Sequence, residues 1–100
     1  DNPSLLYDII QTFIASMPAQ IGILKKTIRE GDATAAERAA HSIKGAALNL
    51  GGERMAQTAR EIEHNAREKN IQDLDAPIRR LEEELNHLSR ELTETDWKAE

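Results

Sequence analysis

Residues 74–92 read LDAPIRRLEEELNHLSREL and carry the strongest periodic signal in the chain. Apolar side chains recur there at alternating four- and three-residue steps, a spacing that places them on one face of an α-helix. These side chains are Leu74, Ile78, Leu81, Leu85, Leu88 and Leu92. Because an apolar helix face must be buried, the pattern predicts a long helix over residues 73–94 that packs against other helices.

The rest of the chain shows the same helical spacing, interrupted by short breaks. We predict four further helices, over residues 4–16, 18–30, 32–48 and 52–69. Pro18 can open a helix, Gly31 can end one, and Asp32 can cap the next. Since every link is only a few residues long, consecutive helices should lie antiparallel. From Thr93 to Glu100 the apolar stripe is lost, and we expect this tail to fray.

Length, composition and charge limit the function classes. The 100 residues suit one domain over residues 1–100, and the start at Asp1 in place of Met suggests a segment of a longer protein. A net charge of −5 argues against a nucleic-acid binder. Cysteine is absent, and no apolar run approaches the roughly 20 residues of a membrane span. We therefore expect a cytoplasmic domain without disulfides, thiolate metal sites or membrane contact.

One helix carries residues that the bundle alone does not explain. At about 100° per residue, His41 points roughly 140° away from the apolar stripe of residues 32–48, toward solvent. Lys44 and Gly45 follow at three and four residues and share its surface. Glycine inside a helix costs up to about 1 kcal/mol relative to alanine, so Gly45 suggests that a partner's backbone approaches closely. A phosphoryl group on the ring, neutralised by Lys44, would fit this arrangement.

The run from His41 to Ala47, HSIKGAA, followed by Asn49-Leu50-Gly51, resembles the signature of the histidine-containing phosphotransfer family. The likeness extends over roughly residues 4–92. It implies an all-α fold, an antiparallel four-helix bundle with an additional short N-terminal helix. It also implies that His41 is phosphorylated, that Lys44 supports the phosphoryl oxygens, and that Gly45 leaves room for a partner. Ala46 departs from the family pattern, which often has serine there, and this removes a hydroxyl contact near the site.

The resemblance further implies a phosphocarrier in a multistep two-component phosphorelay. The partners would be a response-regulator receiver domain, which supplies Mg²⁺, and a sensor histidine kinase that can belong to the same polypeptide. The chain has no phosphate-binding glycine motif, so we expect no autonomous kinase activity and no cofactor of its own. We expect a monomer. For the docking surface we expect the residues around His41 and a surplus of apolar residues on the first helix: Glu37, Arg38, Leu48, Leu6 and Ile10.

Two alternatives compete with this interpretation. Glu61 with His64, and Glu84 with His87, have the Glu-x-x-His spacing of di-iron bundles, but all four side chains should miss the inward stripes. We therefore predict no metal site and assign no role to either histidine. A non-catalytic adaptor bundle could instead pair with another chain through the leucines of residues 74–92. This alternative leaves the residues around His41 without a purpose.

Overall fold

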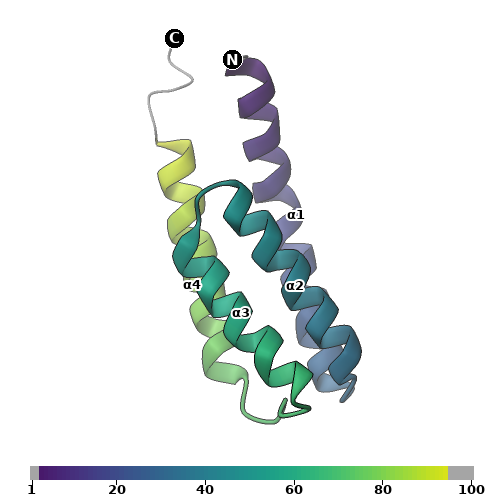
Figure 1. Cartoon of the computed structure of the whole chain (residues 1–100). Helices are drawn as coiled ribbons and strands as arrows, with labels where there is room; N and C mark the ends of the chain where they lie inside the picture. Colours follow the sequence, from purple (N-terminus) through teal and green to yellow (C-terminus); the bar gives the residue numbers. More distant parts are fainter. Residues whose placement is uncertain (1–2, 95–100) are drawn as a thin grey trace.

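The computed structural model describes residues 3–94, and over these residues it consists of four helices (Figure 1). Their bounds are Pro3–Arg29 for α1, Ala33–Asn49 for α2, Glu53–Arg67 for α3 and Asp75–Thr93 for α4. Each helix runs antiparallel to the next along the chain, and α1 also packs against α4, which closes the bundle. The domain is elongated, with extents of 47 × 19 × 17 Å. The all-helical prediction is confirmed for the described residues, and the predicted tail beyond residue 94 lies outside them.

The separate N-terminal helix was predicted wrongly, because α1 is continuous through Pro18. Proline inside a helix costs about 3 kcal/mol. The burial of five side chains on one uninterrupted stripe outweighs that cost, since burying each one stabilises the fold by roughly 1.5–3 kcal/mol. They are Ile10, Phe13, Met17, Ile21 and Leu24. The four-residue step from Met17 to Ile21 keeps this phase across Pro18 only if the helix does not stop, and the proline itself is exposed.

The turn between α1 and α2 is built by two residues, as the sequence predicts. Gly31 has a φ of 74°, in the left-handed region that favours glycine. Its N–H donates to the Ile28 carbonyl, and the N–H of Asp32 donates to the Thr27 carbonyl, which closes the helix end. The Asp32 carboxylate then accepts a bond from the Ala35 N–H at 3.1 Å and caps α2. This turn fixes where the face that carries His41 begins.

Each helix contributes one apolar face to a single core. On α2 the inward residues are small, with Ala36, Ala40, Ile43 and Ala47 fully buried, so its backbone lies close to its neighbours. The leucine stripe of α4 is buried in this same core from Leu74 to Leu88. The adaptor alternative needs those leucines at the surface, so their burial argues against it.

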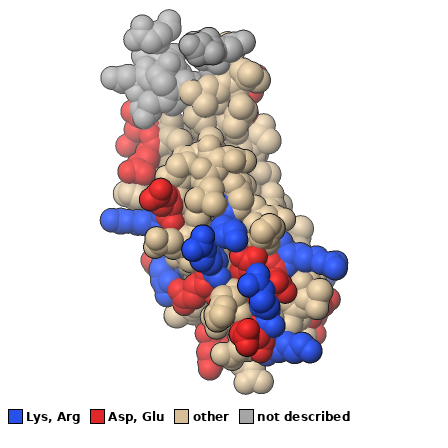
Figure 2. All heavy atoms as spheres, in the orientation of Figure 1, with Lys and Arg blue, Asp and Glu red and all other residues tan. Residues whose placement is uncertain are grey.

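Charged side chains are unevenly distributed on the face formed by α2 and α3. Figure 2 shows basic and acidic groups interleaved over the half of this face away from the α2–α3 loop, whereas the half nearer the loop and the first turns of α1 is mostly uncharged.

None of the described helices is long and apolar enough to cross a membrane.

Candidate functional site

His41 lies on the outer face of α2. Its neighbour Ala40 is fully buried, and the next position along the helix turns about 100° away from the core. The His41 side chain is 67% exposed. The predicted outward orientation is therefore confirmed, and a partner protein can reach the ring.

A buried carboxylate on α3 holds this ring. Glu63 is only 5% exposed, and its Oε2 lies 2.8 Å from His41 Nδ1. An ionised carboxylate can only accept, so Nδ1 must carry the proton of this hydrogen bond. In the neutral imidazole the other nitrogen, Nε2, then keeps its lone pair. The contact therefore selects the tautomer in which Nε2 carries the free lone pair.

Lys44 holds the second oxygen of the same carboxylate. Its Nζ lies 2.8 Å from Glu63 Oε1, and its side chain is 19% exposed. Burial alone would raise the pKa of Glu63, but hydrogen bonds from Lys44 and His41, together with the charges of both groups, lower that pKa below its ordinary value. Glu63 is consequently ionised at neutral pH, as its contact with His41 requires.

Two further side chains, Arg67 and Glu37, complete the cluster. The guanidinium of Arg67 donates from Nε to Glu37 Oε2 at 2.9 Å, and its Nη2 lies 3.4 Å from Glu63 Oε2. The hydrogen bond with Glu37 raises the pKa of Arg67 above its ordinary value. Arg67 thereby ties α3 to Glu37, which lies one turn before His41 on α2. We call His41, Lys44, Glu63, Arg67 and Glu37 the His41 cluster.

The backbone beside His41 is bare. A Cβ added at Gly45 would meet no other atom within 4 Å, so no internal packing requires glycine there. Leu48, one turn further along α2, is 50% exposed, and Leu6 on the first turns of α1 is 43% exposed. Arg38 is exposed as well. Ile10 was expected at a docking surface, but it is only 2% exposed because it lies on the stripe of α1 that faces the core.

The residues of the di-iron alternative do not converge. Glu61 is bonded to Arg80 on α4 at 2.8 Å, His64 is exposed, and His87 pairs with Glu91 one turn away at 3.4 Å. Between residues 3 and 94, no three His, Asp or Glu side chains are grouped as a metal site would need.

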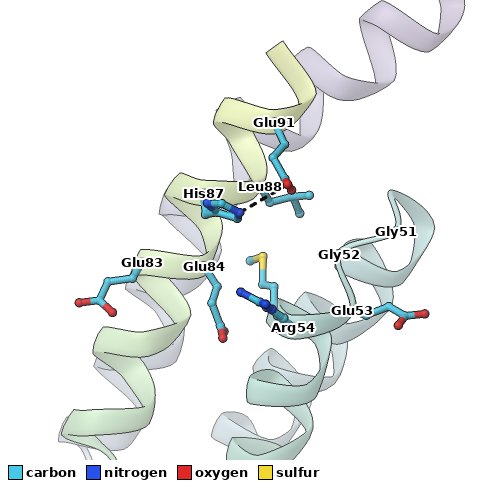
Figure 3. Close-up of a pocket in the computed structure, with 10 residues that line it drawn as sticks. Gly51, Gly52, Glu53, Arg54, Glu83, Glu84, His87, Leu88 and Glu91 are labelled. Carbon is cyan, nitrogen blue, oxygen red and sulfur yellow. Dashed lines mark ion pairs between the residues drawn. The ribbon is translucent and has the colours of Figure 1, made fainter. Parts of the chain in front are cut away.

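A hollow on the surface lies apart from the His41 cluster. It has a volume of about 600 Å³ and lies between the start of α3 and the second half of α4 (Figure 3). Figure 3 shows Glu84 and the ion pair of His87 with Glu91 on the α4 side of the hollow, and Arg54 on the α3 side. No member of the His41 cluster lines this hollow. Lys44 borders a smaller hollow of about 220 Å³ between α2 and α3 instead.

The sequence singles out three members of the His41 cluster, His41, Lys44 and Glu37, and gives no role to the other two. His41 and Lys44 were identified with Gly45, and Glu37 was assigned to docking. Glu63 and Arg67 were not identified. The sequence does contain a signal that Glu63 is buried, because Glu63 follows Ala56 and Ala59 at three- and four-residue steps on the apolar face of the helix. A carboxylate at such a position needs cationic partners, and Lys44 and Arg67 supply them.

Comparison with known proteins agrees with this geometry. The family model described as Hpt domain matches residues 8–91, which include all four helices in large part and every member of the His41 cluster. Searches of curated proteins and of solved structures gave no significant match.

Proposed function

The chain belongs to the Hpt domain family, and from this premise we propose that His41 accepts a phosphoryl group from a phospho-aspartyl receiver domain or a kinase and passes it to a response-regulator receiver. Domains of this family carry out histidine phosphotransfer in phosphorelays. The choice of His41, the direction of transfer and the partners are the proposal.

The observation that carries the proposal is the fixed orientation of the His41 ring. With Nδ1–H bonded to the ionised Glu63, the lone pair of Nε2 faces solvent on an exposed side chain. In the forward step Nε2 attacks phosphorus, the Nε2–P bond forms, and the P–O bond to the donor aspartate breaks. The aspartate carboxylate leaves with the bonding electron pair. The proton on Nδ1 stays in place, and Glu63 stabilises the imidazolium that results.

Lys44 and Gly45 support this step in different ways. Lys44 lies one turn from His41 and can turn one of its donors toward the phosphoryl oxygens while another holds Glu63. The bare backbone at Gly45 lets the acidic pocket of a receiver approach the ring. We assign the Mg²⁺ of the transfer to that receiver and no cofactor to this chain.

For docking we propose the exposed members of the expected set. Leu48 and Leu6 lie toward the end of the bundle that carries the α2–α3 loop, where the surface is mostly uncharged. Glu37 and Arg38 lie on the other side of His41. We propose that the domain acts as a cytoplasmic monomer, alone or as part of a longer kinase chain, and that it has no kinase activity of its own.

The test is transfer from a receiver domain charged with acetyl phosphate. The wild type should gain an acid-labile, base-stable label, and His41→Gln should gain none. His87→Gln is the matched control, because His87 is also an exposed histidine on a helix, with a side chain 60% exposed. It should be labelled like the wild type. Equal labelling of His41→Gln and the wild type would refute the assignment.

A further inference from the structure

We propose that Arg67 is a second cation for the phosphoryl group. It is held by Glu37 while His41 is unmodified, and it turns onto the phosphoryl oxygens once His41 carries them. This inference rests on the proposed function of His41. It adds a residue that contacts the phosphoryl group and a change in the surface that a partner meets.

The geometry places the guanidinium close to the ring. Both His41 Nδ1 and Arg67 Nη2 contact one atom, Glu63 Oε2, at 2.8 and 3.4 Å. The two nitrogens therefore lie no more than 6.2 Å apart, the total of these distances. The phosphoryl group would be on Nε2, across the ring from Nδ1, so the guanidinium must move past the edge of the ring to reach its oxygens. The Arg67 side chain is 56% exposed, so its fork can swing over the surface without displacing core side chains.

The charges favour such a movement after phosphorylation. In the unmodified cluster the two carboxylates, Glu37 and Glu63, balance the two permanent cations, Lys44 and Arg67. A phosphoryl group adds a charge of about −1.5 to −2 and three strong acceptor oxygens. Lys44 already shares its ammonium with Glu63. The balanced cluster thus becomes negative, and the phosphoryl oxygens compete with Glu37 for the Arg67 guanidinium.

Arg67 has donors to spare. A guanidinium has five N–H donors in a planar fork that matches phosphate oxygens in pairs. Only Nε makes a short bond, to Glu37 at 2.9 Å, and the Nη2 contact with Glu63 is long at 3.4 Å. Glu37 is itself a third exposed, so its bond competes with water, and a doubly charged phosphoryl group attracts the fork more strongly.

The movement would free Glu37. Its carboxylate lies one turn before His41 on the exposed face of α2 and would lose its cation. The unmodified and phosphorylated forms would then present different charges beside the ring. A receiver with an acidic pocket would meet an additional repulsive charge only in the phosphorylated form, which gives it a means to distinguish the two forms.

The experiment must distinguish the effect of Arg67 on the phosphoryl group from the effects of two other arginines. Arg38 is exposed and precedes His41 by three residues, so it tests whether any nearby positive charge suffices. Arg80 is the distant control, because it is bonded to an exposed glutamate at 2.8 Å in the same way as Arg67 is bonded to Glu37. Unlike Arg67, it contacts no member of the His41 cluster.

The experiment uses phosphoramidate as the donor, so that no partner protein is needed. Nε2 of His41 attacks phosphorus, the Nε2–P bond forms, the P–N bond of phosphoramidate breaks, and ammonia leaves. Phosphohistidine is followed by ³¹P NMR, and the Arg67 Nε–H signal is followed by ¹⁵N NMR before and after the reaction. In the wild type we expect the Arg67 signal to move and the Arg80 signal to stay.

The lifetime of phosphohistidine gives a second readout. A guanidinium bonded to the phosphoryl oxygens stabilises phosphohistidine through charge-assisted hydrogen bonds, and part of this stabilisation is lost when the N–P bond is hydrolysed. Arg67→Gln should therefore shorten the half-life by about three- to fivefold, the size that an exposed charge pair provides. Arg80→Gln should leave the half-life unchanged. Arg67→Lys should give an intermediate value, since it keeps the charge and loses the fork.

The outcomes separate this inference from the proposed function. If no phosphohistidine forms in the wild type, the proposed function fails and the inference fails with it. If phosphohistidine forms but the Arg67 signal stays and Arg67→Gln decays like the wild type, only the inference is overturned. It is also overturned if the Arg67 signal stays while Arg38→Gln shortens the half-life as much as Arg67→Gln, because a general positive field would then be responsible.

Discussion

Replacement of Glu63 by glutamine tests the link between the buried carboxylate and the reactivity of His41. The amide has the size of the carboxylate, but it offers one acceptor and one donor group where Glu63 offers two acceptors. If its oxygen faces Lys44, its N–H group faces the ring, and Nδ1 must become an acceptor. The proton then moves to Nε2, and the nucleophilic lone pair is lost. If its oxygen faces His41, Lys44 loses its partner.

The expected size of the effect follows from the contact itself. A hydrogen bond to a charged group contributes about 1.5–3 kcal/mol, which corresponds to roughly a 10- to 100-fold bias between the two tautomers. Because the His41 ring is 67% exposed, water competes for this bond and the lower end applies. We expect Glu63→Gln to be phosphorylated about tenfold more slowly than the wild type.

The assay is single-turnover transfer from a charged receiver, with the ring tautomer measured by ¹⁵N NMR. Glu61→Gln is the matched control, because Glu61 lies on the same helix and is bonded to Arg80 at 2.8 Å, outside the His41 cluster. It should transfer like the wild type. The reasoning is refuted if Glu63→Gln transfers at the wild-type rate while its Nδ1 remains protonated, since the carboxylate would then be unnecessary for both effects.

Three further predictions concern stability and access. Gly45→Ala should raise the free energy of unfolding by about 0.5–1 kcal/mol, because the added Cβ meets open space. Gly45→Leu should stay folded but accept the phosphoryl group far more slowly. Equal rates of phosphoryl transfer to Gly45→Leu and Gly45→Ala would argue against close docking. Pro18→Ala should raise the free energy of unfolding by about 1–3 kcal/mol in urea titrations, and a loss of stability would show that the proline is needed in α1. The pKa of Glu63 in the folded chain lies below its ordinary value of 4.5, so the contribution of Glu63 to stability is complete above pH 4.5 and is lost as the pH falls through the lower, folded pKa. In urea titrations over that range, the difference in unfolding free energy between the wild type and Glu63→Gln should shrink as the pH falls. A constant difference would contradict the lowered pKa.

Apart from the break predicted at Pro18, local signals predicted the helix ends to within two residues. The turn at Gly31 and Asp32 and the leucine stripe of α4 depend on residues close together in sequence, and the structure places both as predicted. The predicted end at residue 69 differs from the observed end at Arg67 by two residues. Lys69 adopts a left-handed φ of 61°, and no residue type there signals such a turn.

The errors arose where distant contacts decide the outcome. The sequence predicts a helix start at Pro18 because the cost of proline inside a helix is a local effect. The packing that outweighs this cost comes from α2 and α4, which are distant in sequence. The prediction for Ile10 assumed more apolar residues on the first helix than one core face could use, yet the continuous α1 buries it. The contact between His41 and Glu63 joins residues 22 apart in sequence, and helical periodicity within either segment carries no information about it.

The most direct test of the account is to locate the phosphoryl group on the ring. Heteronuclear NMR that correlates ³¹P, ¹⁵N and ring protons in the phosphorylated chain can distinguish the residue and the nitrogen. The account predicts one phosphohistidine, at His41, with phosphorus bonded to Nε2 and the proton retained on Nδ1 next to Glu63. Phosphorus on Nδ1 of His41, or on His64 or His87, would contradict it.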